Sequence, residues 1–385
     1  MNLNNNFFKI EHLSKRFGST VALNDVSLSL RKGEVRGLIG ENGSGKSTLC
    51  SIISGIYNMD RGKMYKEGKL YSPQTPIEAN NLGVAMVVQE LGVIETLTVA
   101  ENIFLGRTHH FSNKGLLNIK KMRKNAENEL NKCGISNVRV DNLTDTLSIE
   151  ERKLVELVRA LSVDPDILIL DEITQALSHD NRELLYKIID EYIKRGKTII
   201  LVTHNVEEML KIADNITVLR DGNVVGTVKS DEITADGLKT MMIGRNISGE
   251  YYREDNQESF QEDIVLSVEN LGGGKIRNIS FDLHKGEILA VCGLSDAGIH
   301  DLGKSIYGMV DGRVGNVIDV NTGQNLLKPK DVVNAKGAYV PKDRDNDGLM
   351  INASVKDNLF MPSAKELANK INFIAPKKIK NLVNE

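Results

Sequence analysis

The chain has few cysteines, no surplus of basic residues and no long apolar run. The three cysteines, Cys50, Cys133 and Cys292, are scattered and lack metal-ligand spacing, so we expect buried or free thiols in a reducing compartment. A formal net charge of −3 gives no support to nucleic-acid binding, which usually leaves a basic footprint. No apolar run approaches the roughly 20 residues that span a bilayer, and the first residues lack a signal-peptide pattern. We therefore expect a protein that is soluble in itself, with any membrane role passing through a partner.

The length of 385 residues favours two domains, each with its own core. Apolar runs that end at polar residues predict strands, and amphipathic segments between them predict helices. The expected strands cover 35–39, 84–88, 167–170 and 198–202, and the expected helices cover 46–55, 118–132, 182–194 and 206–212. Continuous apolar strands that alternate with helices predict a mostly parallel α/β sheet. The alternating pattern of residues 7–38 predicts short, half-buried strands beside it.

One segment of the sequence occurs twice. Residues 40–48 read GENGSGKST, and residues 293–301 read GLSDAGIHD. The same difference of 253 in residue number relates Ser27 to Ser280, Gly33 to Gly286, Glu34 to Glu287, Gly45 to Gly298 and Gly55 to Gly308. A constant offset over many positions indicates an internal repeat. We expect a first nucleotide-binding domain at 6–248, an acidic linker at 249–263 and a partial second unit at 264–385.

The first copy matches the phosphate loop G-x-x-x-x-G-K-[ST], which predicts binding of ATP with Mg²⁺. In such a loop, glycines let backbone N–H groups surround the phosphates, the lysine reaches the β- and γ-oxygens, and the hydroxyl after it binds the metal. The candidate binding residues are Gly40, Glu41, Asn42, Gly43, Ser44, Gly45, Lys46, Ser47 and Thr48, with Ser47 as metal ligand. The alternative is a glycine-rich turn in a fold that binds no nucleotide. A strand before the loop and a helix after it favour the phosphate site.

Asp171 and Glu172 end an apolar strand, where ligands meet open α/β sheets. Asp171 suits the surroundings of Mg²⁺, and Glu172 suits polarisation of an attacking water. An acidic pair at a strand end can also cap a helix. The loop upstream favours the catalytic interpretation.

The second copy of the loop has lost its chemistry. Ile299 replaces the lysine, His300 replaces the metal-binding hydroxyl, and Asp296 places a carboxylate where phosphates would lie. We do not expect strong phosphate binding there.

Four further motifs follow the first phosphate loop along the chain. They are Gln89 after a strand, Leu147-Ser148 before a helix, Asp171-Glu172, and Thr203-His204 after the next strand. In this order, the chain resembles the tandem ATP-binding subunits of bacterial ABC importers for monosaccharides of the ribose, galactose and xylose type. Segments 99–107, 218–222, 242–245 and 339–344 resemble the same subfamily, which typically has a degenerate second loop. The likeness covers nearly the whole chain and implies P-loop cassettes with a mostly parallel sheet, an antiparallel β subdomain and a helical subdomain.

The resemblance assigns roles to further residues. It implies that Phe17 stacks on adenine, although a core aromatic is the alternative. It implies that Gln89 touches Mg²⁺ and the water, and that His204 contacts the γ-phosphate, so the catalytic set is Glu172, His204 and Gln89. The metal set is Ser47, Gln89 and Asp171. The implied partners are permease subunits and, indirectly, an extracytoplasmic sugar-binding protein, with the chain at the cytoplasmic face of the membrane.

The chain departs from the family at its signature loop, usually Ser-Gly-Gly-Gln. Here the loop reads Ser148-Ile149-Glu150-Glu151. In the family, this serine binds the γ-phosphate of the opposing cassette, which Glu150 and Glu151 would repel. An ordinary capped helix is the alternative. Ile173 and Ser178 replace the usual proline and aspartate.

The family completes the first loop with the signature of the second cassette, and this chain ends before that signature. We therefore expect ATP binding with poor hydrolysis by the isolated chain, or a homodimer in which each first domain lends Ser148 to the other's Lys46. Two rival functions remain. A soluble tandem ATPase of the translation-factor type predicts two intact loops and a long basic linker, and a regulatory product of a shortened gene predicts no turnover.

Overall fold

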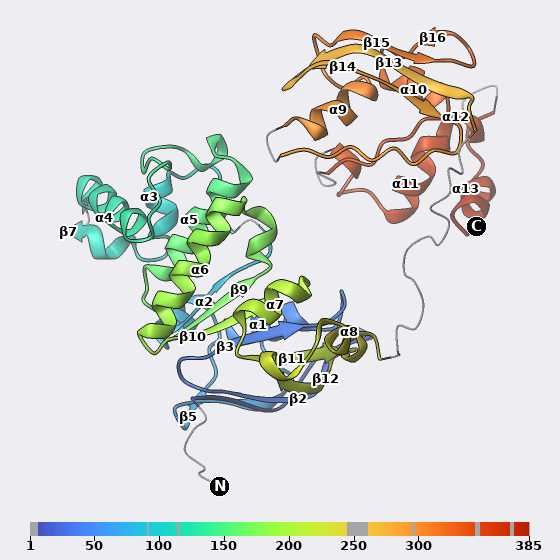
Figure 1. Cartoon of the computed structure of the whole chain (residues 1–385). Helices are drawn as coiled ribbons and strands as arrows, with labels where there is room; N and C mark the ends of the chain where they lie inside the picture. Colours follow the sequence, from blue (N-terminus) through green and yellow to red (C-terminus); the bar gives the residue numbers. More distant parts are fainter. Residues whose placement is uncertain are drawn as a thin grey trace. The chain divides into compact units, whose positions relative to one another are not determined.

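The computed structural model describes residues 7–90, 92–113, 116–244, 261–294, 297–342, 347–369 and 373–384. The chain divides into two compact units, Met1–Glu250 and Tyr251–Glu385 (Figure 1). Residues 249–260 of the expected acidic linker lie outside the described residues. No helix in the described ranges has the length and apolar character needed to cross a bilayer.

The first unit is built on a six-stranded sheet in the order β12-β11-β3-β10-β9-β6. Its strands are β3 (Val35–Ile39), β6 (Val84–Val87), β9 (Ile167–Asp171), β10 (Thr198–Val202), β11 (Asn215–Arg220) and β12 (Asn223–Lys229). All neighbours pair in parallel except β11 and β12, which form an antiparallel hairpin at one edge. The predicted mostly parallel sheet is confirmed. Because the strands are parallel, the ends of β3, β10, β9 and β6 lie in sequence along one edge of the sheet.

Alternate residues of the central strands enter two different cores. In β9, Leu168 and Leu170 join the core that includes α5 and α6, whereas Ile167 and Ile169 face the core that includes α1 and the antiparallel sheet. Every residue of β3, β9 and β10 is buried. A strand covered on both faces needs apolar side chains at consecutive positions, which is why residues 167–170 and 199–202 read as continuous apolar runs; β3 is the exception, since it carries buried Arg36.

The antiparallel sheet has the order β2-β1-β4-β5. Its strands are β1 (Phe8–Phe17), β2 (Thr20–Leu30), β4 (Arg61–Lys66) and β5 (Lys69–Tyr71). Apolar residues of β1 and β2 alternate towards the core that contains α1, which explains the period of two in the sequence.

The helices of the first unit are α1 (Lys46–Ile53), α2 (Pro76–Asn81), α3 (Val99–Ile103), α4 (Ile119–Lys132), α5 (Ile149–Leu161), α6 (His179–Lys194), α7 (Val206–Ile212) and α8 (Ala235–Ile243). Helices α3, α4 and α5 pack together as a helical part (Figure 1). Helix α6 begins at His179, earlier than the predicted start at residue 182, because its first turn is polar and shows no apolar period. A short ribbon, β7 (Ser112–Asn113) with β8 (Leu116–Leu117), precedes α4.

The second unit contains a four-stranded antiparallel sheet in the order β14-β13-β15-β16. Its elements are β13 (Ile264–Gly273), β14 (Ile276–His284), α9 (Ile299–Ile306), β15 (Val314–Asp319), β16 (Gln324–Asn325), α10 (Pro329–Asn334), α11 (Val355–Phe360), α12 (Ala364–Leu367) and α13 (Pro376–Asn384). Its small core joins Val268, Leu271, Leu302 and Val317. Among its described residues, no parallel sheet forms.

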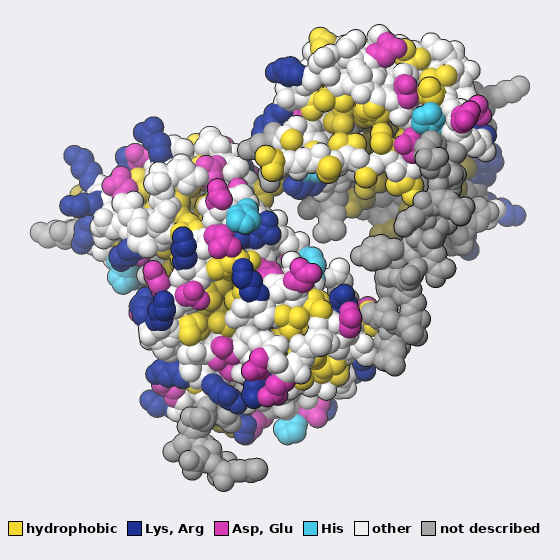
Figure 2. Space-filling view, in the orientation of Figure 1, with side chains coloured by type: hydrophobic (Ala, Val, Ile, Leu, Met, Phe, Trp, Pro, Cys, Tyr) yellow, Lys and Arg dark blue, Asp and Glu magenta, His cyan; other side chains and the backbone are white. Residues whose placement is uncertain are grey.

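The surfaces of the two units differ in chemistry. On the visible face of the first unit, charged side chains of both signs are interspersed, whereas apolar side chains gather on the second unit (Figure 2). The exposed apolar residues of the second unit include Ile288, Val291 and Leu294, which lie outside any strand. Val340 is also among them and is 91% exposed.

Candidate nucleotide site

The loop between β3 and α1 needs glycine for steric reasons. Gly43 and Gly45 have φ values of 80° and 101°, which disfavour residues with a Cβ. A Cβ on Gly45 would lie 2.6 Å from the carbonyl oxygen of Ala22, and one on Gly40 would lie 2.1 Å from that of Leu219. The three glycines therefore let the loop turn tightly into the N-terminus of α1.

Lys46 begins α1 and folds back over the loop. Its Nζ donates hydrogen bonds to the carbonyl oxygens of Gly40 at 2.8 Å and Glu41 at 2.9 Å. Only 6% of the residue is exposed. Burial lowers the pKa of Lys46, and the nearby carboxylates of Glu172 and Asp171 partly oppose that shift. The ammonium group is thus held at the mouth of the loop, close to both acidic residues.

Asp171 ends β9 beneath the loop. It is buried, and its Oδ1 has no hydrogen-bond partner among the described residues. Burial raises its pKa, whereas a hydrogen bond from Ser47 lowers it. A buried carboxylate oxygen without a donor, beside a serine hydroxyl, matches the oxygen ligands that Mg²⁺ prefers. The described residues contain no cluster of three or more His, Cys, Asp or Glu suited to a metal, so Mg²⁺ would need phosphate or water oxygens as well.

Glu172 follows in a left-handed conformation, with φ 50°. Its backbone N–H donates to the carbonyl oxygen of Val202 at 3.0 Å. The side chain is 9% exposed, and its Oε2 accepts from Gln89 Nε2 at 2.8 Å and from Gln175 Nε2 at 2.5 Å. The strained backbone turns the carboxylate across the end of the sheet, towards the residues that follow β6 and β10.

His204 lies just after β10, and its Nδ1 is 3.6 Å from Glu172 Oε1 and 3.2 Å from Gln175 Nε2. The three predicted catalytic residues Glu172, Gln89 and His204 therefore share one place at the carboxyl edge of the sheet. The strand order explains this. Gln89, Glu172 and His204 follow β6, β9 and β10, and these three strands are neighbours, with β9 between β6 and β10.

Two residues of this region, Gln175 and Glu208, carry no sequence motif that predicts them. Glu208 is buried in α7, and its carboxylate accepts from the hydroxyls of Thr174 at 3.0 Å, Thr203 at 2.9 Å and Tyr186 at 2.8 Å. It thereby ties the segment after Glu172 to the end of β10, next to His204. Only the place of Thr174 and Thr203 beside the predicted motifs hinted at such a link.

Phe17 and Ser148 lie apart from this group of contacts. Phe17 ends β1 with 42% of its surface exposed and meets Tyr57 edge-on, with ring centroids 5.2 Å apart. It is therefore an exposed aromatic side chain and no part of either core. An exposed ring can stack on a base, as the resemblance implies.

At Ser148, the structure has the capped helix that the sequence left as an alternative. Ser148 Oγ donates to Glu151 Oε2 at 3.0 Å and accepts from the Glu151 N–H at 3.2 Å. Glu150 Oε1 accepts from the Ser178 N–H at 2.7 Å and from Asn181 Nδ2 at 2.6 Å. Both carboxylates are thus engaged in hydrogen bonds at the starts of α5 and α6.

In the second unit, Gly298 has φ 83° and caps α9, in which Ile299 and His300 are the first residues. Neither side chain can supply the ammonium or the hydroxyl found at Lys46 and Ser47. Asp296, the third expected change, lies outside the described residues.

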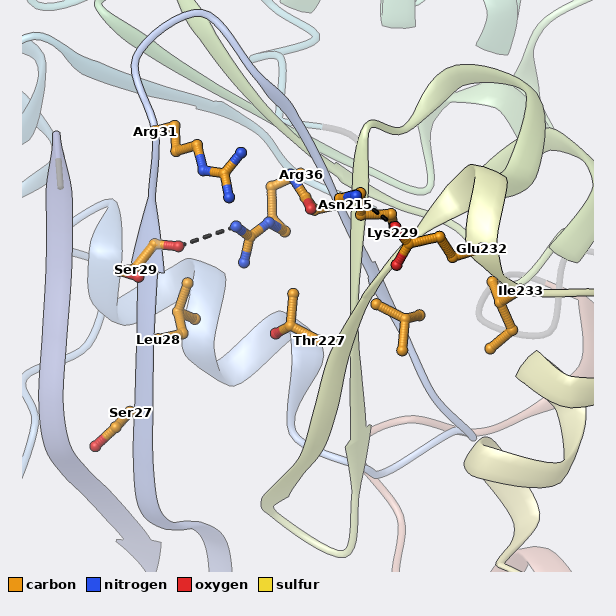
Figure 3. Close-up of a pocket in the computed structure, with 11 residues that line it drawn as sticks. Ser27, Leu28, Ser29, Arg31, Arg36, Asn215, Thr227, Lys229, Glu232 and Ile233 are labelled. Carbon is orange, nitrogen blue, oxygen red and sulfur yellow. Dashed lines mark hydrogen bonds and ion pairs between the residues drawn. The ribbon is translucent and has the colours of Figure 1, made fainter. Parts of the chain in front are cut away.

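A polar pocket of about 680 Å³ lies elsewhere on the first unit, between β2 and β12 (Figure 3). Arg36 lines it, and its guanidinium donates to Ser29 O, Thr217 Oγ1 and Glu34 Oε1 at 2.8 to 3.0 Å. These bonds join both sheets of the unit through one buried cation. None of the predicted nucleotide residues lines this pocket.

Comparisons with known proteins identify the family. Residues 23–175 match the family model described as ABC transporter. The chain is 35% identical over 372 residues to the putative ribose/galactose/methyl galactoside import ATP-binding protein 1 of Agrobacterium fabrum, covering 96% of this chain and 72% of that protein. It is 35% identical over 373 residues to the ribose import ATP-binding protein RbsA of Clostridium tetani, covering 97% of this chain and 73% of that protein.

Among solved structures, the dimeric ATP-binding cassette MJ0796 bound to ADP and Pi matches with a TM-score of 0.51 and 26% identity, over 58% of this chain and 98% of that one. The ADP conformation of the cassette MJ1267 matches with a TM-score of 0.50 and 26% identity, over 61% and 94%. The P-loop fold, the pairing of the motifs and these relatives lead to one conclusion: the chain belongs to the ABC transporter family and is an ATP-binding cassette ATPase.

Proposed function

We propose that this protein is the ATP-binding subunit that energises import of a sugar through an ABC permease. The convergence of Lys46, Asp171, Glu172, Gln89 and His204 at one sheet edge carries the ATPase part of the proposal. The proposal that the imported substrate is a sugar rests on the relatives. They are named for import of ribose or galactose and match over nearly this whole chain.

The phosphate loop holds the nucleotide. Lys46 exchanges its bonds to the carbonyls of Gly40 and Glu41 for the β- and γ-phosphate oxygens. The backbone N–H groups of residues 40–48 face the phosphates at the start of α1, and the exposed ring of Phe17 stacks on adenine. Ser47, Asp171 and Gln89 would hold Mg²⁺, which when bound neutralises charge on the phosphates. The unpaired Oδ1 of Asp171 supports this assignment.

The residues beyond the phosphates position water. Glu172 accepts a hydrogen bond from the attacking water, and Gln89, within hydrogen-bond reach of Glu172, orients both. His204 faces the γ-phosphate from the neighbouring strand. Attack in line with the leaving oxygen then needs little more than this fixed arrangement and charge neutralisation.

The second unit is, in this proposal, a partial copy of the first. The His12 N–H donates to Ser27 Oγ at 2.9 Å, and the Asn270 N–H donates to Ser280 Oγ at 2.8 Å. At the end of β2, the Arg31 N–H donates to Glu34, three residues later in the chain. At the end of β14, the His284 N–H donates to Glu287 in the same way. Such repeated local contacts support the fused arrangement 6–248, 249–263 and 264–385.

The exposed apolar segment of the second unit corresponds in sequence to a buried strand of the first unit. Ile288 and Val291 are related by the offset of 253 to Val35 and Leu38 of β3, which are buried between β10 and β11. The described residues of the second unit include no counterpart of those flanking strands. The relatives are longer, since this chain spans 72% to 75% of their length in three cases.

Permease subunits, an extracytoplasmic sugar-binding protein and a place at the cytoplasmic face of the membrane follow from the proposed import function. A homodimer through the first domain is the arrangement that would bring Ser148 of one chain to Lys46 of another. In that dimer the bonds between Ser148 and Glu151 must open before the hydroxyl reaches a phosphate.

A hydrolysis-deficient ATP-binding protein is the second candidate function, favoured by those same capping bonds. Turnover measured across protein concentration separates the two. A rise steeper than linear supports pairing of chains, and absence of turnover at all concentrations supports the second candidate. High, strictly proportional turnover by a proven monomer contradicts both.

The main test is Lys46→Ala, assayed by ATP affinity and hydrolysis, with Lys69→Ala, an exposed residue of β5, as a control. We expect Lys46→Ala to abolish ATP binding or turnover, because no other described cation lies against the loop carbonyls. The control should match the parent chain. Unchanged ATP affinity and hydrolysis in Lys46→Ala would show the assignment to be wrong.

A further inference from the structure

Gln175 lies between the two groups expected to act on water and phosphate. It belongs to the short 3-10 turn Ile173–Ala176, directly after Glu172. Its Nε2 is 2.5 Å from Glu172 Oε2 and 3.2 Å from His204 Nδ1. One amide nitrogen with two hydrogens thus bridges residues that follow two different strands, β9 and β10.

The orientation of this amide is determined by the carboxylate. An ionised carboxylate can only accept hydrogen bonds, so the amide atom facing Glu172 must be the NH₂ group. The opposite orientation would place the amide oxygen 2.5 Å from an anionic oxygen. The same nitrogen, Nε2, faces His204 Nδ1. An amide nitrogen has no lone pair available to accept a hydrogen bond.

His204 Nδ1 must therefore accept the second hydrogen of this amide. In a neutral imidazole, one nitrogen donates and the other accepts. If Nδ1 accepts, the proton is on Nε2, at the far side of the ring. That tautomer gives the exposed face of His204 an N–H donor.

We propose that Gln175 is a positioning residue that holds neutral His204 in the Nε2–H tautomer and braces Glu172 at the same time. The inference rests on the proposed function, in which His204 faces the γ-phosphate, since a phosphate oxygen requires a donor. Without Gln175, the partner that remains for Nδ1 among the described residues is Glu172 Oε1, 3.6 Å away, and an acceptor there draws the ring proton to Nδ1. His204 would then present a bare nitrogen to the nucleotide.

The test is ¹⁵N NMR of histidine-labelled full-length chain without nucleotide, at about pH 8, above the ordinary histidine range. Protonated and bare ring nitrogens resonate apart, and loss of signals in His204→Asn assigns the ring. We expect the Nε2–H tautomer in the parent chain. In Gln175→Leu, which keeps bulk but removes the donor, the ratio of Nδ1–H to Nε2–H should rise about fivefold, the ratio that one ordinary hydrogen bond sustains.

Two further variants sharpen the result. Gln175→Glu places an acceptor beside Nδ1 and should shift the proton to Nδ1 more strongly than Gln175→Leu does. Gln74→Leu removes an exposed glutamine far along the chain from this site and should leave the His204 signals unchanged. A dominant Nδ1–H tautomer in the parent chain, or the same ratio in the parent and Gln175→Leu, overturns the proposal.

Turnover provides a second readout. In Gln175→Leu, kcat should fall by at most about fivefold, because kcat follows the population of the Nε2–H tautomer, and KM should stay within about twofold because the phosphate loop is intact. Failure of the proposed function is seen separately, as unchanged ATP affinity in Lys46→Ala. The tautomer measurement needs no nucleotide, so it decides the inference whether or not the isolated chain turns over.

Discussion

Glu208 offers a quantitative test of how the site is supported. Its buried carboxylate accepts three hydroxyl hydrogen bonds, from Thr174, Thr203 and Tyr186. Hydrogen bonds to a charged group are worth about 1.5 to 3 kcal/mol each, and a buried donor left without a partner costs about 1 to 3 kcal/mol. Allowing for water entering beside Tyr186, Glu208→Ala should lower the free energy of unfolding by about 3 to 5 kcal/mol.

The assay is urea or thermal unfolding with Glu207→Ala as the matched control. Glu207 and Glu208 are adjacent in the first turn of α7, so both interact with the helix dipole, but Glu207 is exposed. The midpoint of thermal unfolding should fall by about 10 °C in Glu208→Ala and change little in Glu207→Ala.

The pKa of Tyr186 gives a second measurement on the same variant. Burial is the larger cause and the hydrogen bond to Glu208 the next, and together they raise this pKa to about 12. Loss of the carboxylate removes a group that disfavours the phenolate, so the pKa should fall in Glu208→Ala. If the free energies of unfolding of Glu208→Ala and Glu207→Ala differ by less than about 1 kcal/mol, the three hydrogen bonds do not support the site, since losing all three cannot cost so little.

Two further predictions concern stability. Glu34→Ala should destabilise the first unit by about 3 to 5 kcal/mol in urea unfolding, because it leaves the Arg36 guanidinium buried without its carboxylate. Glu232→Ala, in the same pocket, is the control and should leave the midpoint unchanged; similar losses in both would contradict the role of burial. Gly45→Ala should destabilise more than Gly43→Ala without nucleotide, because both have positive φ but only Gly45 adds a clash, 2.6 Å from Ala22 O. Equal midpoints for the two glycine variants would show that the clash relaxes.

The sequence allowed the phosphate loop and most of the central elements to be predicted. The predicted strand at 198–202 and the predicted helix at 206–212 have the observed bounds. These predictions succeeded because apolar periodicity and loop chemistry are local properties of the chain. The start of α6 was predicted too late, since its first turn holds polar residues and shows no apolar period.

Contacts between distant segments were harder to foresee. The sequence does not show that the carboxylate of Glu208 binds Thr174 and Tyr186, because those contacts depend on where α7 lies relative to α6 and to the end of β9. The same holds for Glu150: the sequence left open whether it faces a phosphate or belongs to an ordinary capped helix, and its bonds to Ser178 and Asn181 appear only in the structure.

The sequence by itself determined that this chain has one intact phosphate loop, a second altered copy and the acidic pair at the end of a buried strand. These follow from residue identity and spacing, which the chain states directly. Only the tertiary structure decided which side chains meet at the sheet edge and how Gln175 bridges Glu172 and His204. The reason is geometric. Parallel pairing brings together the ends of β3, β10, β9 and β6, which are far apart in the sequence. The hydrogen bonds between the side chains at those ends depend on this pairing.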